Sequence, residues 1–322
     1  MIEVLHPGML STVQDLGRHG YTQLGISPAG AADEMLLRMG NLLLGNPENA
    51  AAIEFTGRGG RYRFLSDAWI AVSGAFQVKL GANSIRAMRA IAVKAGETLS
   101  VGEAVEGLRG YLCVAGGMEV PELLGSRSTH LPSGLGGFAG RALRTGDLVP
   151  VGANDGRGIP LDRQRPIDDL WVAAPPESPL RLTPGPHLEY FEPSALQELC
   201  HREWVVKPDS SRMGVRLKSK RIEAKPNRES AGFFGGTGKI LSEGVPLGAL
   251  QATPSGELIL LGVDAQTTGG YPILGSLISV DLSRLGQLRP GDIVRFDVVT
   301  LEVAYRLLME RETRIYEWKE RL

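Results

Sequence analysis

The chain has 322 residues, a formal net charge of -1 at pH 7, 43% hydrophobic residues and 22% charged residues. A near-neutral chain has no overall basic field, so the composition argues against binding to nucleic acid or to an anionic membrane surface. This length allows two domains with sizeable cores, and we expect the partners to be proteins or small molecules.

The spacing of reactive residues excludes further kinds of site. Cys113 and Cys200 are too far apart for a C-x-x-C metal or redox motif, and two thiols in a chain this long are typical of a reducing cytosol. The histidines have no paired ligand spacing, so we expect no metal site. The opening residues MIEVLHPG form no leader, and no apolar run approaches ~20 residues, so we expect a cytoplasmic protein without a membrane span.

The first elements in chain order are a strand, a polar loop and a helix. Residues 2–5 predict the strand, and Pro7-Gly8 ends it. The loop at residues 11–20 can present Arg18 to a ligand, but it can also be a solvated connection. From residue 31 to residue 44, apolar residues recur at helical spacing, with Asp33 in the first turn, where the helix dipole favours negative charge.

Beyond the helix the pattern changes to short strands with glycine-rich turns, which favour a barrel or a sandwich. The predicted strands of the first half are 52–55, 62–64, 69–72, 76–80, 91–93 and 111–115. The second half predicts a short helix from Pro193 and strands at 204–206, 258–263 and 293–296. Residues 301–322 alternate apolar and charged side chains and predict a terminal helix that docks by one face.

An ordered set of turn residues occurs in both halves. Gly-Gly, Pro, Leu-Gly-Ser and Leu-Arg-x-Gly-Asp-h-Val, where h is an apolar residue, follow one another from Gly116 to Val149 and again from Gly269 to Val294. Chance agreement of one turn is common in β proteins, but agreement of the whole ordered set is improbable. We therefore expect two related, mainly β domains at 1–153 and 180–300, joined by a connecting segment at 154–179 and followed by a helix at 301–322.

Two stretches of the second half have the chemistry of a site. Gln266-Thr267-Thr268-Gly269-Gly270-Tyr271 places an amide, hydroxyls and a phenol beside glycines, which suits a polar ligand held against backbone, although the glycines can also serve only a hairpin. Residues 210–217 contain Ser211, Arg212 and Arg216, and guanidinium groups bind carboxylate or phosphate with forked hydrogen bonds. The alternative is an edge strand protected by charge. Residues 232–240 do not form a P-loop, because the first glycine and the Mg²⁺-binding hydroxyl are missing.

These motifs together resemble one protein family. Residues 12–18, 25–33, 41–46, 211–217 and 266–272 are similar to the KipA-type family. That family comprises the C subunit of bacterial ATP-dependent 5-oxoprolinase and the related carboxyltransferase domain of urea carboxylase, also called allophanate hydrolase subunit 2-like. The resemblance implies two cyclophilin-like β-barrel domains from an internal duplication, which agrees with the repeat.

The resemblance also implies an activity and partners. A KipI-like B subunit and a third, A subunit would act with this chain to phosphorylate 5-oxoproline and open it to L-glutamate, making the chain a subunit of an ATP-dependent lactam hydrolase. ATP and Mg²⁺ would be shared with the partner or held by it. The resemblance places catalytic roles on Arg212, Arg216 and Gln266. It places substrate-binding roles on Arg18, Pro28, Ser211, Thr267, Thr268, Gly269, Gly270 and Tyr271.

Two alternatives remain from the same resemblance. The first is a biotin-dependent carboxyltransferase acting on urea or a related amide. The stretch most similar to a biotin hairpin, Ala87-Met88-Arg89-Ala90, has arginine where the attachment lysine is required, so we expect no covalent biotin on this chain. The second is a non-catalytic regulator of a KipI-like histidine-kinase inhibitor.

Overall fold

The structure is a computed structural model that describes residues 1–153, 178–219 and 240–321. The chain divides into two compact units. Unit 1 comprises Met1–His19, Pro28–Trp171 and Glu317–Leu322, and unit 2 comprises Gly20–Ser27 and Val172–Tyr316. Most of the expected connecting segment at 154–179, and most of the glycine-rich stretch at 232–240, lie outside the described residues.

Unit 1 contains two antiparallel sheets. The first has the order β11 (Leu148–Val149), β1 (Ile2–His6), β4 (Arg61–Phe64), β9 (Thr98–Ala104), β6 (Phe76–Leu80) and β7 (Asn83–Ile85). The second has the order β2 (Leu10–Gln14), β3 (Ala52–Thr56), β10 (Arg109–Val114), β5 (Ala68–Ser73) and β8 (Ala90–Val93). The strands expected from the short apolar runs of the first half are therefore present.

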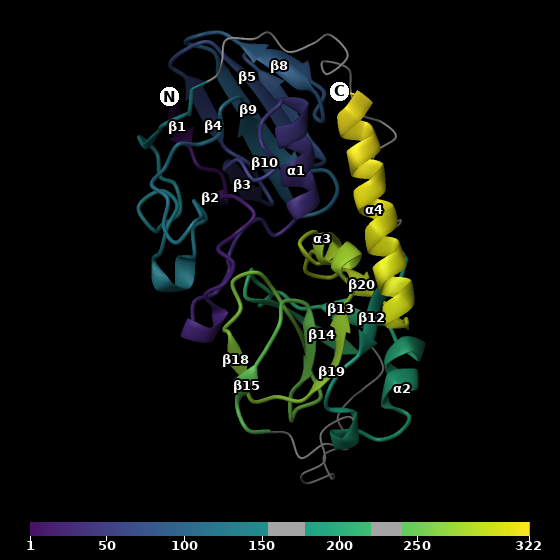
Figure 1. Ribbon diagram of the computed structural model, residues 1–322. Helices are drawn as coiled ribbons and strands as arrows, with labels where there is room; N and C mark the ends of the chain where they lie inside the picture. Colours follow the sequence, from purple (N-terminus) through teal and green to yellow (C-terminus); the bar gives the residue numbers. More distant parts are fainter. Residues whose placement is uncertain (154–177, 220–239, 322) are drawn as a thin grey trace. The chain divides into compact units, whose positions relative to one another are not determined.

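The core of unit 1 takes one set of alternating residues from each sheet. Val13, Ile53, Leu112 and Val72 are fully buried and belong to one hydrophobic cluster with residues of β1, β4 and β9. Because side chains alternate along a strand, the intervening residues of the second sheet lie on its opposite face. Helix α1 (Glu34–Leu43) packs on β10 and β5, as Figure 1 shows.

Helix α1 starts where the sequence predicts, with one difference in detail. Asp33 is the N-cap residue rather than a residue of the first turn, and its side chain accepts a hydrogen bond from the Leu36 N–H. Gly40 faces the second sheet, and a Cβ at this position would lie 2.6 Å from the Cys113 sulfur. The helix therefore approaches the sheet closely through glycine.

Unit 2 is built around one large sheet that nearly closes into a barrel, with β12 paired to β19 on one side and in parallel to β21 on the other. Its order is β20 (Ile293–Val294), β13 (Trp204–Val206), β14 (Gly214–Ser219), β17 (Leu258–Leu261), β16 (Ala249–Ala252), β19 (Ile273–Leu277), β12 (Leu180–Pro184) and β21 (Phe296–Val298). A separate pair consists of β15 (Glu243–Gly244) and β18 (Thr268–Gly269). Leu182, Trp204, Leu217, Leu250 and Leu258 are fully buried inside.

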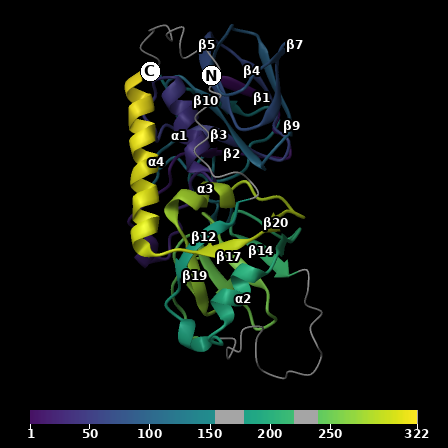
Figure 2. The same cartoon turned by 90° about the vertical axis from the view of Figure 1, so that its right-hand side faces the viewer.

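Short helices complete the described chain. They are α2 (Ala195–His201), α3 (Leu282–Leu285) and the 3-10 turns η1 (Thr22–Leu24), η2 (Leu131–Ser133), η3 (Leu188–Tyr190) and η4 (Ser279–Asp281). Figure 2 shows α2 outside the large sheet, and α2 contacts β21. The long helix α4 (Leu301–Arg321) confirms the terminal helix, and Ile315 and Trp318 are buried on one face as the pattern predicts.

The repeated Leu-Arg-x-Gly-Asp turn has the same hydrogen bonds in both units. Asp147 accepts from the Arg144 N–H at 2.7 Å, and Asp292 accepts from the Arg289 N–H at 2.7 Å. In each turn the glycine has positive φ, 89° at Gly146 and 93° at Gly291. The repeated Gly-Gly pairs differ, because Gly116 and Gly117 have positive φ whereas Gly269 and Gly270 do not.

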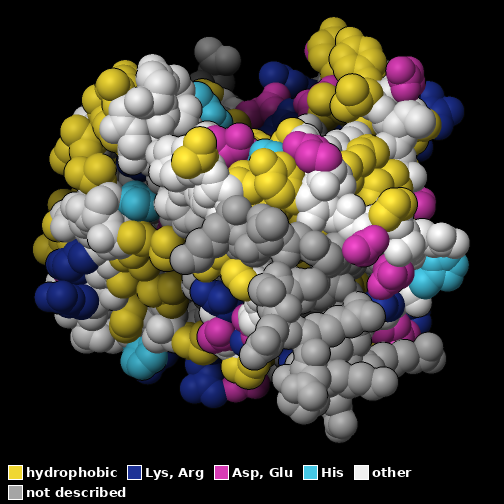
Figure 3. All heavy atoms as spheres, turned by 90° about the horizontal axis from the view of Figure 1, so that it is seen from below, with side chains coloured by type: hydrophobic (Ala, Val, Ile, Leu, Met, Phe, Trp, Pro, Cys, Tyr) yellow, Lys and Arg dark blue, Asp and Glu magenta, His cyan; other side chains and the backbone are white. Residues whose placement is uncertain are grey.

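A mainly β fold with few helices and a C-terminal helix is thus confirmed. No helix among the described residues is long and apolar enough to cross a membrane. Figure 3 shows basic, acidic and hydrophobic side chains interspersed on one face, as expected for a chain with a net charge of -1.

Candidate functional site

Each unit contains a set of buried polar residues. In unit 1 they lie on the face of the second sheet that is turned away from the core. Thr12 on β2 is paired with Glu54 on β3, which is paired with Tyr111 on β10. All three side chains are at most 2% exposed. Burying a row of polar side chains on a sheet face costs folding free energy unless each group has a hydrogen-bond partner. Such a row therefore indicates a structural or a binding role.

The carboxylate of Glu54 is the centre of this row. Its Oε2 accepts a hydrogen bond from the Tyr111 hydroxyl at 2.7 Å and one from the Ala32 N–H at 2.9 Å. The Tyr111 oxygen accepts from the Asp33 N–H at 2.9 Å, and the Arg109 Nε lies 3.8 Å from Glu54 Oε1. Burial, followed by the nearby charge of Glu54, raises the pKa of Tyr111 well above its ordinary value. Tyr111 therefore remains a neutral donor to Glu54.

A second cluster in unit 1 is built around Asp15, directly after β2. Its carboxylate accepts hydrogen bonds from the Ser126 hydroxyl at 2.7 Å, the Arg127 N–H at 2.6 Å and the Gly17 N–H at 2.8 Å. It also accepts a short hydrogen bond from the Ser128 hydroxyl. Asp15 thus ties the loop after β2 to residues 126–128.

Arg18 is held beside this cluster. Its guanidinium donates to the Ser128 carbonyl, and its N–H donates to the Pro28 carbonyl at 2.8 Å. The Arg18 side chain is 1% exposed, so it is far more enclosed than a loop side chain offered to solvent. A Cβ at Gly136, which has a φ of 65°, would lie 2.2 Å from the Ser128 carbonyl oxygen and 2.5 Å from Arg18 Nη2. Glycine is therefore required there for the loop to pass over Arg18.

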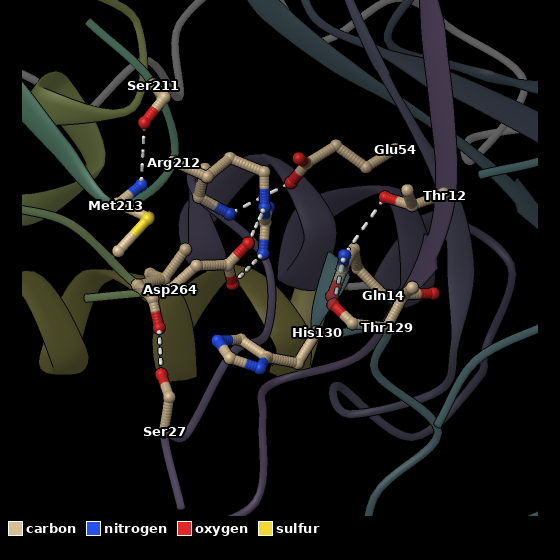
Figure 4. A network of polar contacts seen from close by, with 12 residues as sticks. Thr12, Gln14, Ser27, Glu54, Thr129, His130, Ser211, Arg212, Met213 and Asp264 are labelled. Atoms are coloured by element: carbon tan, nitrogen blue, oxygen red, sulfur yellow. Dashed lines mark hydrogen bonds and ion pairs between the residues drawn. The ribbon is translucent and has the colours of Figure 1, made fainter. Parts of the chain in front are cut away.

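Gln14 extends the polar face toward the same loop, as Figure 4 shows. Its Nε2 donates to Thr12 Oγ1 at 2.9 Å and to the Thr129 carbonyl at 3.0 Å. Because a carbonyl accepts only, the amide orientation is fixed. Within the described part of the chain, Gln14 Oε1 is a buried acceptor without a hydrogen-bond donor.

In unit 2 the main feature is a buried ion pair between Arg212 and Asp264, drawn in Figure 4. The Nε and Nη2 atoms of Arg212 donate to the two carboxylate oxygens of Asp264, each at 2.8 Å. The side chains are 6% and 2% exposed. This forked pair joins the turn before β14 to the residue that begins the stretch leading to Gln266.

The predicted motif at 266–271 follows directly. Its carbonyls are already used: Thr267 accepts from the Val245 N–H at 3.0 Å, and Gly270 accepts from the Ile240 N–H at 2.9 Å. The Tyr271 carbonyl accepts from Gln251 Nε2 at 3.3 Å. Gln266 and Thr268 are exposed, and Thr267 and Tyr271 are partly exposed.

Glycine is needed at position 269 for a packing reason. A Cβ there would lie 2.7 Å from the Nε2 atom of Gln251, which is 1% exposed and anchored on β16. The backbone of the motif therefore lies directly over a buried amide. Neither of the two glycines has the positive φ that a tight hairpin turn of primed type requires.

The remaining predicted residues are placed as follows. Ser211 is exposed, and its hydroxyl accepts from the Met213 N–H at 3.2 Å. Arg216 is 41% exposed and lies near Asp209 at 3.5 Å and Glu257 at 3.9 Å. Arg18 and Pro28 belong to unit 1, whereas Ser211, Arg212, Arg216 and residues 266–271 belong to unit 2.

Sequence reasoning missed several residues of these clusters. They are Asp15, Glu54, Tyr111, residues 126–130, His187 and Asp264. A carboxylate between two apolar strand residues, Ile53-Glu54-Phe55, is a signal that was present in the sequence. The run Ser126-Arg127-Ser128-Thr129-His130 before a glycine-rich stretch was another. No group of three or more His, Cys, Asp or Glu among the described residues has the arrangement of a metal site.

Comparisons with known proteins agree along nearly the whole chain. Residues 24–298 match the family described as the carboxyltransferase domain, subdomain A and B. The sequence is 35% identical to the C subunit of 5-oxoprolinase from Escherichia coli strain K12 over 313 residues, covering 97% of this chain and 96% of that protein. It is 36% identical to the C subunit of 5-oxoprolinase from Haemophilus influenzae, covering 98% and 96%.

A solved structure has a similar fold. The crystal structure of the urea amidolyase of K. lactis superposes with a TM-score of 0.85 at 31% sequence identity. The superposition covers 98% of this chain and 20% of that much longer protein.

Proposed function

Because the chain belongs to the family of carboxyltransferase domains with subdomains A and B, and matches the 5-oxoprolinase C subunits from end to end, we propose that it is the C subunit of an ATP-dependent 5-oxoprolinase. The observation that carries the proposal is the match of 97% of this chain to 96% of the Escherichia coli protein. The match to urea amidolyase is as long on this chain but covers a fifth of that protein.

The reaction is the opening of a five-membered lactam to L-glutamate. A lactam carbonyl is a poor electrophile, and phosphorylation of its oxygen by ATP makes the carbon reactive toward water. Catalysis of phosphoryl transfer depends on positioning and on stabilisation of charge, and the reaction needs no covalent protein nucleophile. ATP and Mg²⁺ act in the complex, with the KipI-like B subunit and the A subunit as partners.

Gln266 and Thr268 are the groups we assign to substrate in unit 2. Both are exposed, and the carbonyls of Thr267, Gly270 and Tyr271 are occupied by protein donors. An amide and a hydroxyl can bind the carboxylate or the lactam carbonyl of 5-oxoproline. Arg212 acts chiefly through Asp264, because both donors of its Nε and Nη2 edge are given to that carboxylate.

The test is phosphate release from ATP by this chain mixed with its KipI-like and A partners, with and without 5-oxoproline. We expect release that needs every chain and rises with 5-oxoproline. Release that is indifferent to 5-oxoproline while the complex remains assembled would contradict the proposal. Urea and free biotin are the controls that detect carboxyl transfer.

The carboxyltransferase alternative is weakened by Arg89. This residue stands where a biotin hairpin has its attachment lysine, and a guanidinium cannot form the biotin amide. The preceding residue, Met88, has a φ of 57° and donates its N–H to the Val72 carbonyl at 2.8 Å, so this stretch is a turn leading into β8. A carboxyltransferase could still use biotin carried by another protein, and the urea and biotin controls test this possibility.

A further inference from the structure

His187 lies in the loop between β12 and η3 and is 8% exposed. Its Nδ1 accepts a hydrogen bond from the Ile273 N–H at 3.1 Å. Its Nε2 lies 3.1 Å from Glu243 Oε1, and its ring makes an edge contact with Tyr190, with 5.9 Å between ring centroids. Both ring nitrogens therefore have defined partners.

The hydrogen bond from Ile273 fixes the tautomer of the neutral ring. A nitrogen that accepts from a backbone N–H cannot itself carry a proton, so Nδ1 is the unprotonated nitrogen. The proton of the neutral ring is then on Nε2, which lies 3.1 Å from the carboxylate of Glu243. A second proton on Nδ1 would replace the lone pair that holds Ile273.

The two partners of His187 are both next to the 266–271 motif, one on the strand paired with it and one on the strand that follows it. Glu243 is paired directly with Gly269 across the β15–β18 ladder. Ile273 begins β19, two residues after Tyr271. The ring thus connects the strand that faces the motif to the strand that follows it.

We propose that His187 is a positioning residue which, through its hydrogen bond from Ile273 and its contact with Glu243, sets the conformation of Gly269 and Gly270 for substrate. The proposal deepens the function proposed above and rests on it, because residues 266–271 are the substrate segment there. His187 touches no reacting atom in this account. Its effect on substrate binding is transmitted by the backbone at Glu243, which is paired with Gly269, and at Ile273, which follows the motif.

Two substitutions separate the two contacts of the ring. In His187→Asn, the side-chain carbonyl reaches the place of Nδ1 and can still accept from Ile273. In His187→Gln, the amide nitrogen reaches the place of Nε2 and can still contact Glu243. Glu243→Gln keeps an oxygen within reach of Nε2, so it serves as the matched control.

In the reconstituted complex, we expect His187→Ala to raise the KM for 5-oxoproline about tenfold with a smaller change in kcat, since substrate contacts are misplaced rather than removed. His187→Asn should recover part of this loss, and Glu243→Gln should stay within about threefold of wild type. Equal KM values for wild type and a folded His187→Ala variant would overturn the proposal.

Measurements on the chain itself keep this test separate from the activity. Nitrogen NMR should show His187 with a protonated Nε2 and an unprotonated Nδ1 at neutral pH, and the opposite tautomer would overturn the proposal. Amide hydrogen exchange at Gly269, Gly270 and Ile273 should quicken in His187→Ala while the rest of unit 2 is unchanged. If 5-oxoproline has no effect on ATP turnover, the proposed function fails. In that case hydrogen exchange tests the positioning role by itself, and unchanged exchange in His187→Ala would refute that role.

Discussion

Arg212 and Asp264 form a buried, forked ion pair in which both hydrogen bonds are 2.8 Å long. The pair is reinforced by the backbone, because the Asp264 N–H donates to the Arg212 carbonyl at 3.1 Å. Asp264 stands two residues before Gln266, so the position of the proposed substrate motif depends on an arginine more than fifty residues earlier in the chain.

The first prediction concerns this pair. Removing one member leaves the other charge buried without its counter-charge, which commonly costs ~3–5 kcal/mol of unfolding free energy. Arg212→Leu should lose about that amount, and the double variant Arg212→Leu/Asp264→Leu should lose less than either single variant. Urea denaturation monitored by fluorescence measures the cycle.

Arg216→Leu is the matched control for that cycle. Its guanidinium is 41% exposed and pairs with carboxylates at 3.5 and 3.9 Å, so its loss should cost no more than about 1 kcal/mol. If Arg216→Leu lost as much unfolding free energy as Arg212→Leu, burial would not explain the stability of the Arg212–Asp264 pair.

The second prediction concerns Gly269. In Gly269→Ala the new methyl group would meet the buried amide of Gln251 at 2.7 Å, so the motif must shift and substrate binding should weaken by roughly tenfold or more. Gly244→Ala, on the paired strand, is the control, because a Cβ there meets no atom within 4 Å. Steady-state KM and kcat for 5-oxoproline report the effect. Equal values for the two variants would refute the packing argument.

The third prediction tests the polar row of unit 1. Tyr111→Phe leaves Glu54 without its hydroxyl donor and the Asp33 N–H without its acceptor, and an unpaired buried group costs about 1–3 kcal/mol. Thermal unfolding should show this loss. Tyr190→Phe, at a side chain 36% exposed, should change the unfolding free energy by less than about 0.5 kcal/mol.

The fourth prediction is a pH dependence of stability above pH 10. Burial raises the pKa of Tyr62 from 10.0 to about 12, while its hydrogen bond with Ser11 acts weakly in the opposite direction. Ser11 donates its hydroxyl proton to the Pro7 carbonyl at 2.6 Å, and its oxygen lies 3.0 Å from the Tyr62 hydroxyl oxygen.

The sign follows from the raised pKa. The folded state holds the Tyr62 proton more tightly than the unfolded state, so the stabilisation is complete below pH 10 and is lost as the pH rises toward 12. The loss should be about 3 kcal/mol over this range, and Tyr62→Phe should flatten that part of the curve. Urea denaturation at several alkaline pH values measures it, and an unaltered slope in the variant would contradict the assignment to Tyr62.

Much of the fold followed from local patterns. The apolar run at Leu258–Leu261 and the helical spacing after Asp33 lie where the structure has β17 and α1. The repeated turns ending in Asp147 and Asp292 also proved to share their hydrogen bonds. These features depend on neighbours in sequence, which is why periodicity and turn chemistry predict them.

The site was less accessible to such reasoning. Glu54 and Tyr111 meet across two strands, and Asp15 meets Ser126 across more than a hundred residues. Sequence spacing contains no information on these pairings. The expectation that Arg212 holds an anionic ligand stays a prediction, and the structure pairs its Nε and Nη2 atoms with Asp264. A single sequence cannot distinguish a guanidinium that binds substrate from one that orients a loop, because the same chemistry serves both.

The most direct test of the central claim is the formation of L-glutamate from 5-oxoproline by this chain together with the KipI-like B and A subunits that we propose as its partners, measured against ADP formed. We predict that glutamate and ADP appear in equal amounts, and that both depend on this chain. Glutamate formed at the same rate without this chain, or ADP formed with urea and biotin instead of 5-oxoproline, would contradict it.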